Sequence, residues 1–178
     1  MDLSRLERQL KEHNSAIAPV EQWDPPFCGD LDMQIRHDGS WHYMGTPIGR
    51  QALVRLFASV LKREGENYYL VTPVEKVGIQ VEDVPLIVTN WREEQGVLVF
   101  TTNTGHSFVV GEEHPVTLMS DRVTADLLPY ANAWRNLYAR LHQNVFYQLV
   151  GRGRETQLEG HRQLVIDSGD YSFSLGIL

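Results

Sequence analysis

Hydrophobic residues recur at helical spacing in three segments of the chain. Leu3, Leu6 and Leu10 form a narrow apolar stripe near the N-terminus, where Asp2 is placed to cap a short helix. A second segment predicts a helix between residues 47 and 65, with apolar positions at Leu53, Leu56, Phe57, Val60 and Leu61. A third predicts a long helix over residues 130–149, with a possible break near Asn144 and apolar positions at Tyr130, Trp134, Leu137, Leu141, Val145 and Leu149.

Elsewhere the hydrophobic period changes to two, which is typical of half-buried strands. A hairpin is predicted over residues 33–44, because Asp38-Gly39 supplies the positive φ that tight turns require. A short strand follows at 68–71, and Ser168-Gly169-Asp170 predicts a last hairpin over residues 163–175. Between them, short turns join a series of strands that predicts an antiparallel meander, at residues 77–81, 86–90, 97–101, 107–110 and 116–119.

Helices and strands are segregated rather than alternating, and this order predicts an α+β fold with antiparallel sheets. We expect two units. Residues 1–74 would form an N-terminal α+β unit with the order helix, hairpin, helix, strand, and residues 75–178 a β-rich unit with one long helix. Both halves contain strands, then an amphipathic helix, then more strand, although no sequence repeat connects the two halves.

Composition and charge narrow the functional classes. The chain has 178 residues, 42% of them hydrophobic and 22% charged, which is the balance of an ordinary globular protein. A net charge of -7 argues against binding to a nucleic-acid backbone, but it leaves room for a small anionic ligand held by a few arginines. Cys28 is the single cysteine, and the sequence shows neither a signal peptide nor an apolar run of membrane-spanning length. We therefore expect a cytoplasmic protein without a membrane span.

No enzyme motif stands out, so we name no catalytic residue, no metal site and no cofactor. His37 and His42, with Asp30 or Asp32, could hold a metal ion, but turn chemistry explains these residues better. Asp30 and Asp32 could also act as paired carboxylates, although a turn contact for Asp30 and an exposed Asp32 account for them better.

The segment from Gly45 to Arg50 is more suggestive. Two glycines open a helix, whose first N–H groups and dipole favour an anion. A cation such as Arg50 is unfavourable at this helix end, which indicates that it serves either a ligand or an ion pair with Glu75 or Asp83.

Two further segments, Thr72–Lys76 and Val81–Pro85, bracket a single strand at the expected junction of the units. Each sets acidic or hydroxyl groups beside a proline-fixed turn, and clefts between domains are preferred ligand sites. Turn chemistry alone is the competing interpretation. Arg135, in the predicted third helix, could approach the same junction.

Residues 29–85 resemble an uncharacterised proteobacterial family, the domain of unknown function numbered 1285. The motifs DGSW, GTPIGR, LVRLFASVL, YYLVTPVEK and VEDVP stand in the family's order. TTN at 101–103 and PY at 129–130 with Arg135 continue the likeness more loosely, and the sequence departs from the family after Gly151. The resemblance implies two related α+β units, the second similar to a pleckstrin-homology-like β-structure with a helix. It also implies a pocket between the units for a nucleotide-like ligand, a role in signalling, and motif positions at Trp41, Arg50, Thr72, Glu75, Lys76 and Asp83.

Three functions remain open from the sequence. The first is a ligand-binding module, in which Arg50 and Lys76 meet phosphate, Trp41 or Tyr68 offers an aromatic face, and Glu75 or Asp83 accepts from sugar or base. The second is a hydrolase or transferase with Asp30, Asp32 or Glu75 as general base. The third is a protein-interaction module that adds a partner strand to an exposed edge of the C-terminal sheet.

Overall fold

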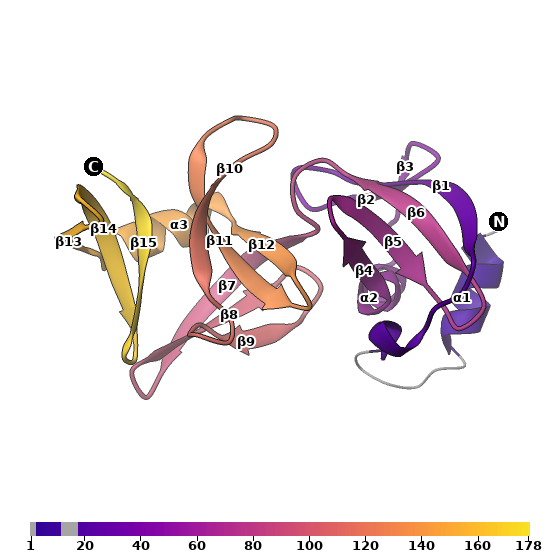
Figure 1. Ribbon diagram of the computed structural model, residues 1–178, viewed down its shortest axis with the longest axis horizontal. Coiled ribbons are helices and arrows are strands. Elements are labelled where there is room, and N and C mark those ends of the chain that lie inside the picture. The colour runs from indigo at the N-terminus through magenta and orange to yellow at the C-terminus, as the bar shows by residue number, and fades with distance from the viewer. Residues whose placement is uncertain (1–2, 12–17) are drawn as a thin grey trace. The chain divides into compact units, whose positions relative to one another are not determined.

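The computed structural model describes residues 3–11 and 18–178, and it divides into two compact units between Glu82 and Asp83 (Figure 1). The sequence predicted the division at residues 74 and 75, before strand β6 (Lys76–Val81). In the structure, β6 pairs in parallel with β1 (Phe27–Ile35) and antiparallel with β5 (Asn67–Val71). Strand β6 therefore belongs to the N-terminal sheet, and no local pattern in the sequence discloses that pairing.

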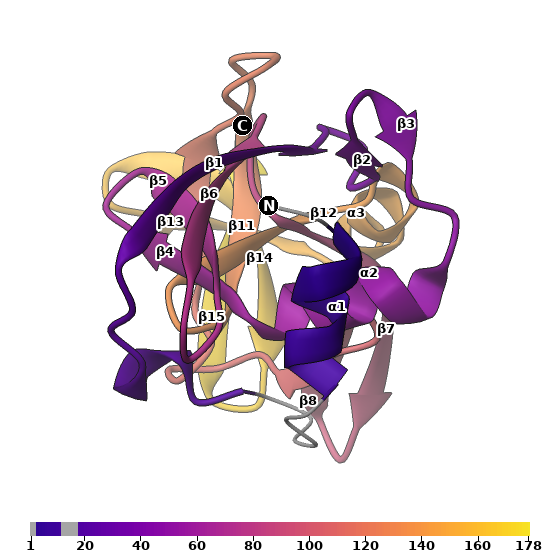
Figure 2. The ribbon, with the colours of Figure 1, turned by 90° about the vertical axis from the view of Figure 1, so that its right-hand side faces the viewer.

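Among the described residues of the N-terminal unit, three segments are helical: α1 (Leu3–Lys11), the 3-10 turn η1 (Val20–Gln22) and α2 (Gln51–Ser59). Asp2, the expected cap of α1, lies outside the described residues. Helix α2 ends earlier than predicted, because Leu61–Glu64 forms strand β4 and pairs with β5. Figure 2 shows α1 and α2 packed side by side.

The N-terminal sheet has six strands in the order β3-β2-β1-β6-β5-β4, with β2 at Trp41–Tyr43 and β3 at Thr46–Pro47. All neighbours pair antiparallel except β1 and β6. The predicted hairpin at Asp38-Gly39 is confirmed: Gly39 has φ 85°, and the Arg36 N–H donates to the Ser40 carbonyl at 2.9 Å. Strand β1 starts at Phe27 rather than Met33, because its first half pairs with β6.

One face of this sheet forms the core of the N-terminal unit. Alternate residues of β1, namely Leu31, Met33 and Ile35, are buried, as the period of two predicted. Trp41 of β2 is 2% exposed and stacks on the fully buried Phe57 of α2, with ring centroids 6.3 Å apart. Helix α2 therefore covers the core face, and the opposite face of the sheet carries mainly polar side chains.

The central sheet of the C-terminal unit also has six strands, in the order β10-β11-β12-β7-β8-β9. Their bounds are β7 Leu86–Glu94, β8 Val97–Thr102, β9 Ser107–Val109, β10 Val116–Ser120, β11 Leu127–Trp134 and β12 Leu137–Leu141. Again all neighbours pair antiparallel except one parallel pair, here β7 and β12.

The predicted long helix over residues 130–149 is wrong. Most of that segment is the hairpin of β11 and β12, which turns at Arg135 and Asn136 with φ 50° and 60°. Only α3 (Gln143–Val150) is helical, and the His142 ring caps it by accepting from the Asn144 N–H at 3.1 Å. The apolar spacing looked helical because both faces of this hairpin are buried, so the alternation typical of a strand is absent.

A second, three-stranded sheet completes the C-terminal unit: β13 (Arg154–Leu158), β14 (His161–Ser168) and β15 (Tyr171–Ile177). The predicted last hairpin is confirmed as β14 and β15, whereas β13 was not predicted. Phe173 of β15 packs edge-on against Phe100 of β8, with centroids 6.4 Å apart. This small sheet therefore covers the core face of the central sheet.

The two six-stranded sheets share one topology. If β1 to β6 are matched in turn with β7 to β12, then strand order, every antiparallel pair and the one parallel pair coincide. The prediction of two related α+β units is thus confirmed at the level of the sheets, which are mixed rather than purely antiparallel. The units differ between their third and fourth strands, where the first has α2 and the second a turn bridged between Gly111 and His114. Within the described ranges, no helix has both the length and the apolar character needed to cross a membrane.

Candidate functional site

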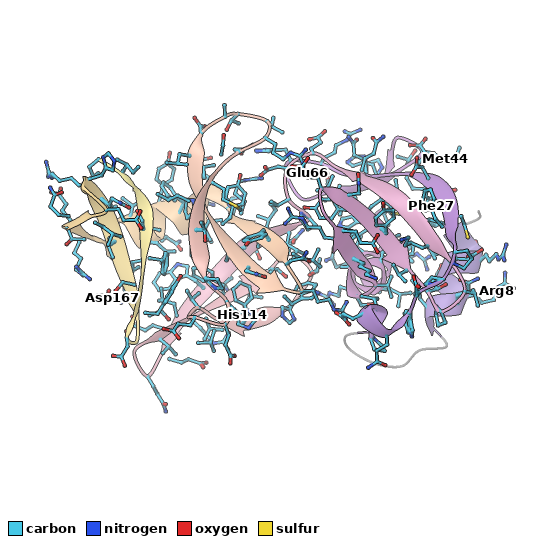
Figure 3. The ribbon with its side chains drawn as sticks, viewed as in Figure 1. Arg8, Phe27, Met44, Glu66, His114 and Asp167 are labelled. Atoms are coloured by element: carbon cyan, nitrogen blue, oxygen red, sulfur yellow. The ribbon has the colours of Figure 1, made fainter. Side chains whose placement is uncertain are left out.

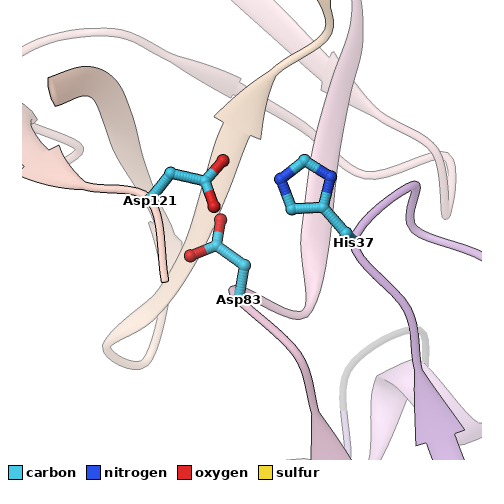
Figure 4. Close-up of side chains that lie close together, drawn as sticks. All are labelled: His37, Asp83 and Asp121. Atoms are coloured by element: carbon cyan, nitrogen blue, oxygen red, sulfur yellow. The ribbon is translucent and has the colours of Figure 1, made fainter. Parts of the chain in front are cut away.

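Asp83, a predicted ligand residue, belongs to a buried charge network of the C-terminal unit. Its carboxylate accepts from the Arg140 guanidinium at 2.7 Å, from the Tyr130 hydroxyl at 2.8 Å and from the Arg122 N–H at 3.0 Å. Asp121 accepts from the Val123 N–H at 2.8 Å and also faces Arg140. The carboxylates of Asp83 and Asp121 lie close together (Figure 4), and the side chain of each is 1% exposed.

In this network the Arg140 guanidinium faces both carboxylates, and backbone N–H groups supply further hydrogen bonds. Burial and the hydrogen bond to Asp83 raise the pKa of Tyr130 far above its usual value, so its hydroxyl stays a neutral donor. The Asp83 carboxylate therefore has three donors within the C-terminal unit itself, and its predicted role as a ligand contact stays a prediction.

The two predicted aromatic contacts, Trp41 and Tyr68, lie in the core of the N-terminal unit. Both are buried, and the Arg63 guanidinium lies 5.9 Å from the Tyr68 ring centre. The Trp41 indole N–H is one of the buried polar groups for which the described residues provide no hydrogen-bond partner. Thr72 is fully buried and closes the turn before β6, since its hydroxyl accepts from the Glu75 N–H at 3.0 Å.

Arg50 and Glu75 both contact helix α1. The Arg50 guanidinium lies 3.1 Å from the Glu7 carboxylate, and Arg5 lies 3.2 Å from Glu75. Arg50 therefore has an ion pair, but with a different carboxylate from the two that the sequence suggested. Glu75 is 8% exposed, and its Oε2 atom has no partner among the described residues.

Lys76 lies on the face of the N-terminal sheet that is opposite the core. Its ammonium group is 3.0 Å from the Glu64 carboxylate and 4.7 Å from the centre of the Tyr69 ring. Lys62 is 3.4 Å from the same carboxylate. The pKa of Glu64 is held below its usual value, mainly by the hydrogen bond from Lys76 and to a smaller extent by Lys62.

Asp30 lies beside Lys76 on the same face. Its carboxylate rests against Gly78, its partner on β6, so closely that a Cβ at position 78 would stand 2.2 Å from Asp30 Oδ1. Phe27 and Tyr69 flank this point edge to face, with ring centroids 5.9 Å apart. We call Phe27, Asp30, Tyr69, Lys76 and Gly78 the Gly78 platform; Figure 3 labels Phe27, which is 56% exposed.

The sequence analysis missed Phe27, Tyr69 and Gly78. Strand alternation was the available signal, because Tyr68 at a buried position requires Tyr69 to point to the opposite face. Asp30 was considered only as a carboxylate for acid–base chemistry or as a turn residue. The parallel pairing that sets it against Gly78 joins segments nearly fifty residues apart, and sequence spacing does not disclose it.

The remaining predicted positions are described within their own units. Arg135 forms part of the β11–β12 turn in the C-terminal unit. His42 contacts Ser40 at 2.9 Å, and among the described residues no metal-sized group joins His37 and His42 to Asp30 or Asp32.

Two models of one family match the chain. The DUF1285 N-terminal domain, described as a domain of unknown function, matches residues 18–84, and the C-terminal domain of the same family matches residues 85–175. Two solved structures to which the chain is similar are described as members of the same family. A DUF1285 family protein from Silicibacter pomeroyi DSS-3 is 42% identical, covering 97% of this chain and 95% of its own, with a TM-score of 0.85. Another, from Shewanella baltica OS155, is 29% identical over 68% of this chain and 91% of its own, with a TM-score of 0.56. No curated protein matches the chain.

Proposed function

Because the chain belongs to the DUF1285 family, whose descriptions name no activity, we propose a function from its own residues: the N-terminal unit binds a small phosphorylated or nucleotide-like molecule on the Gly78 platform. The observation that carries the proposal is the close approach of the Asp30 carboxylate to Gly78. No hydrogen bond or ion pair to that carboxylate occurs among the described residues. Asp30 is exposed, and its carboxylate rests against Gly78 without a partner among the described residues, so it is available to accept from a ligand.

Lys76 is the basic residue of the platform. Lys76 and Lys62 share the single carboxylate of Glu64, and in the local count of charges the Asp30 carboxylate of the platform balances the second ammonium group. Lysine is a common phosphate ligand, acting as a point charge. We therefore assign Lys76 as the cationic contact that the platform offers to a phosphate.

The aromatic rings suit a planar group. Phe27 is more than half exposed and Tyr69 lies beside it, so a base or similar ring could stack there while Asp30 accepts from its N–H or from a sugar hydroxyl. Of the residues that the sequence suggested, this arrangement retains Lys76 and replaces Tyr68 by its neighbour Tyr69.

An enzyme finds less support. Acid–base chemistry would need a proton donor, nucleophile or metal beside Asp30, Asp32 or Glu75. The structure shows only Arg5 pairing with Glu75, and no group that could hold a metal includes any of the three among the described residues. The signalling role, the cytoplasmic location, the pleckstrin-homology-like form and a pocket at the junction of the units stay predictions.

Calorimetric titration with a panel of nucleoside mono- and diphosphates tests the proposal. We expect one nucleotide to bind, and Lys76→Gln to weaken its binding at least tenfold, because the phosphate loses its counter-charge. Arg55→Gln is the matched control. Arg55 is exposed on α2, and its replacement removes the same charge elsewhere in the unit.

Arg50→Ala separates the two possible sites. If Arg50→Ala abolishes binding while Lys76→Gln leaves it unchanged, the ligand uses the family motif around α2 and the platform assignment is wrong. If no nucleotide binds the wild-type chain at millimolar concentration, the proposed function itself fails.

A further inference from the structure

Strand β9 of the C-terminal unit ends its sheet with an unpaired edge. Its residues pair with β8 alone, as Val99 with Val109, Phe100 with Phe108 and Thr101 with Ser107. The Val110 N–H donates to the Leu98 carbonyl and the Thr102 N–H to the His106 carbonyl. In an antiparallel ladder the bonded pairs alternate, so the N–H and C=O groups of Ser107 and Val109 point away from β8.

The edge is not blocked as the matching edge of the N-terminal unit is. Strand β3, which corresponds to β9, contains Pro47 and so lacks a donor there. Strand β9 contains no proline, and Val109 is 49% exposed. Natural sheets usually protect such edges, so an open one indicates a place where another strand can add.

Beside the end of β9 lies an open cavity of ≈ 700 Å³, lined among others by Val97, Val109, Glu112, Glu113 and Asp170. The last hairpin forms one wall, because Ser168 is inserted at the end of the β8–β9 ladder. Its hydroxyl accepts from the Leu98 N–H at 2.9 Å and donates to the Val110 carbonyl at 2.6 Å. The lining therefore combines valine residues with three carboxylates.

The three carboxylates are not neutralised within the protein. Elsewhere in this unit exposed acids pair with arginines, as Glu93 does with Arg152 and Asp167 with Arg154. For Glu112, Glu113 and Asp170, no ion pair exists in the part of the chain that the structure describes. The cavity therefore combines uncompensated negative charge with an apolar wall, next to free backbone groups.

We propose that β9 and this cavity bind an extended segment of a partner protein that carries lysine or arginine at alternate positions. The segment adds to β9 as a further strand, bonding to the free backbone groups of Ser107 and Val109. Neighbouring residues across a ladder share a face, so the side chain opposite Val109 lies on the cavity side. A lysine or arginine there lays its aliphatic stem on Val109 and extends its charge toward Glu112, Glu113 and Asp170.

A capped peptide of alternating threonine and lysine is the probe, and its binding is measured by fluorescence anisotropy at low and high salt. We expect binding that weakens with salt, because exposed charges are screened. Val109→Pro should weaken it at least tenfold: proline removes the outward N–H but no bond to β8. Val109→Thr, which keeps the N–H, is the matched control and should bind within about twofold.

Charge is tested separately. Glu112→Gln with Glu113→Gln should weaken binding at least tenfold, whereas Glu93→Gln with Glu155→Gln removes the same charge at arginine-paired sites and should change it little. The proposal is overturned if the peptide does not bind, if a threonine–glutamate peptide binds equally well, or if Val109→Pro binds like wild type. Thermal unfolding of each variant verifies that it is folded.

Discussion

The two units of this chain build the same six-stranded sheet and cover it differently. In the N-terminal unit, Trp41 of the second strand packs on Phe57 of helix α2. In the C-terminal unit, Phe100 of the corresponding strand packs on Phe173, which comes from the small sheet after α3. The sheet topology therefore does not depend on what covers its core face, provided that a large apolar side chain fills each position.

The difference also determines which surfaces remain open. Helix α2 occupies the connection between the third and fourth strands of the first unit. The edge strand before this helix, β3, ends in Pro47. The second unit has a tight turn in that connection, which leaves β9 and the cavity beside it accessible. The first unit instead offers the polar face of its sheet, where the Gly78 platform lies. One topology thus exposes two different surfaces, for which we propose two kinds of binding.

The largest expected effect comes from removing the covering aromatic of either unit. Phe57→Ala and Phe173→Ala should each lower the free energy of unfolding of their own unit by ~3–5 kcal/mol, since both rings are buried. Hydrogen exchange followed by mass spectrometry localises the loss of protection. If Phe57→Ala deprotects both units equally, the two cores are not independent.

A smaller loss of stability is expected from weakening the buried charge network, which belongs to the C-terminal unit. Tyr130→Phe removes the hydroxyl that donates to Asp83 at 2.8 Å, while the ring stays buried. We expect a loss of ~1–2 kcal/mol in the free energy of unfolding, measured with urea. Tyr147→Phe, at an exposed position of α3, is the control and should change stability by less than ~0.5 kcal/mol. An equal loss in both variants would contradict a structural role for the network.

The smallest effect on stability is expected at Gly78. Gly78→Ala should lower the free energy of unfolding by less than ~1 kcal/mol, because the new methyl group meets only the end of the Asp30 side chain and that side chain can rotate away. The same change displaces the carboxylate, so nucleotide binding should fall at least tenfold by calorimetry. Undiminished binding would show that the position of Asp30 is irrelevant to the ligand.

The local pattern of residues was enough to predict the two hairpins that tight turns define. Asp38-Gly39 and Ser168-Gly169-Asp170 specify their turns through backbone conformation, so both hairpins could be predicted from a few neighbouring residues. The same reasoning failed at residues 130–141, because Ala131, Ala133 and Ala139 are buried on a strand pair that is covered on both faces. Without alternation, a buried strand and a buried helix look alike.

The candidate sites were harder to predict than the fold. Asp83 was expected to meet a ligand, yet it lies within a network whose other members, Tyr130 and Arg140, come from strands that were predicted as helix. Asp30 gave no strong signal, because its significance arises from Gly78 in a parallel neighbour. Sites assembled from distant strands depend on pairing, which the sequence specifies only through the whole sheet.

The hydroxyl of Ser168 has a consequence for the order in which the chain can fold. It connects strand β14 to Leu98 and Val110, which lie 70 and 58 residues earlier. The N-terminal unit holds all six strands of its sheet within residues 27–81, so it can fold as soon as these have left the ribosome. The end of the β8–β9 ladder must wait for Ser168, and until then Phe100 lacks its cover. A chaperone that meets the nascent chain should therefore bind the second unit in that interval, and the first unit should already be protected from it.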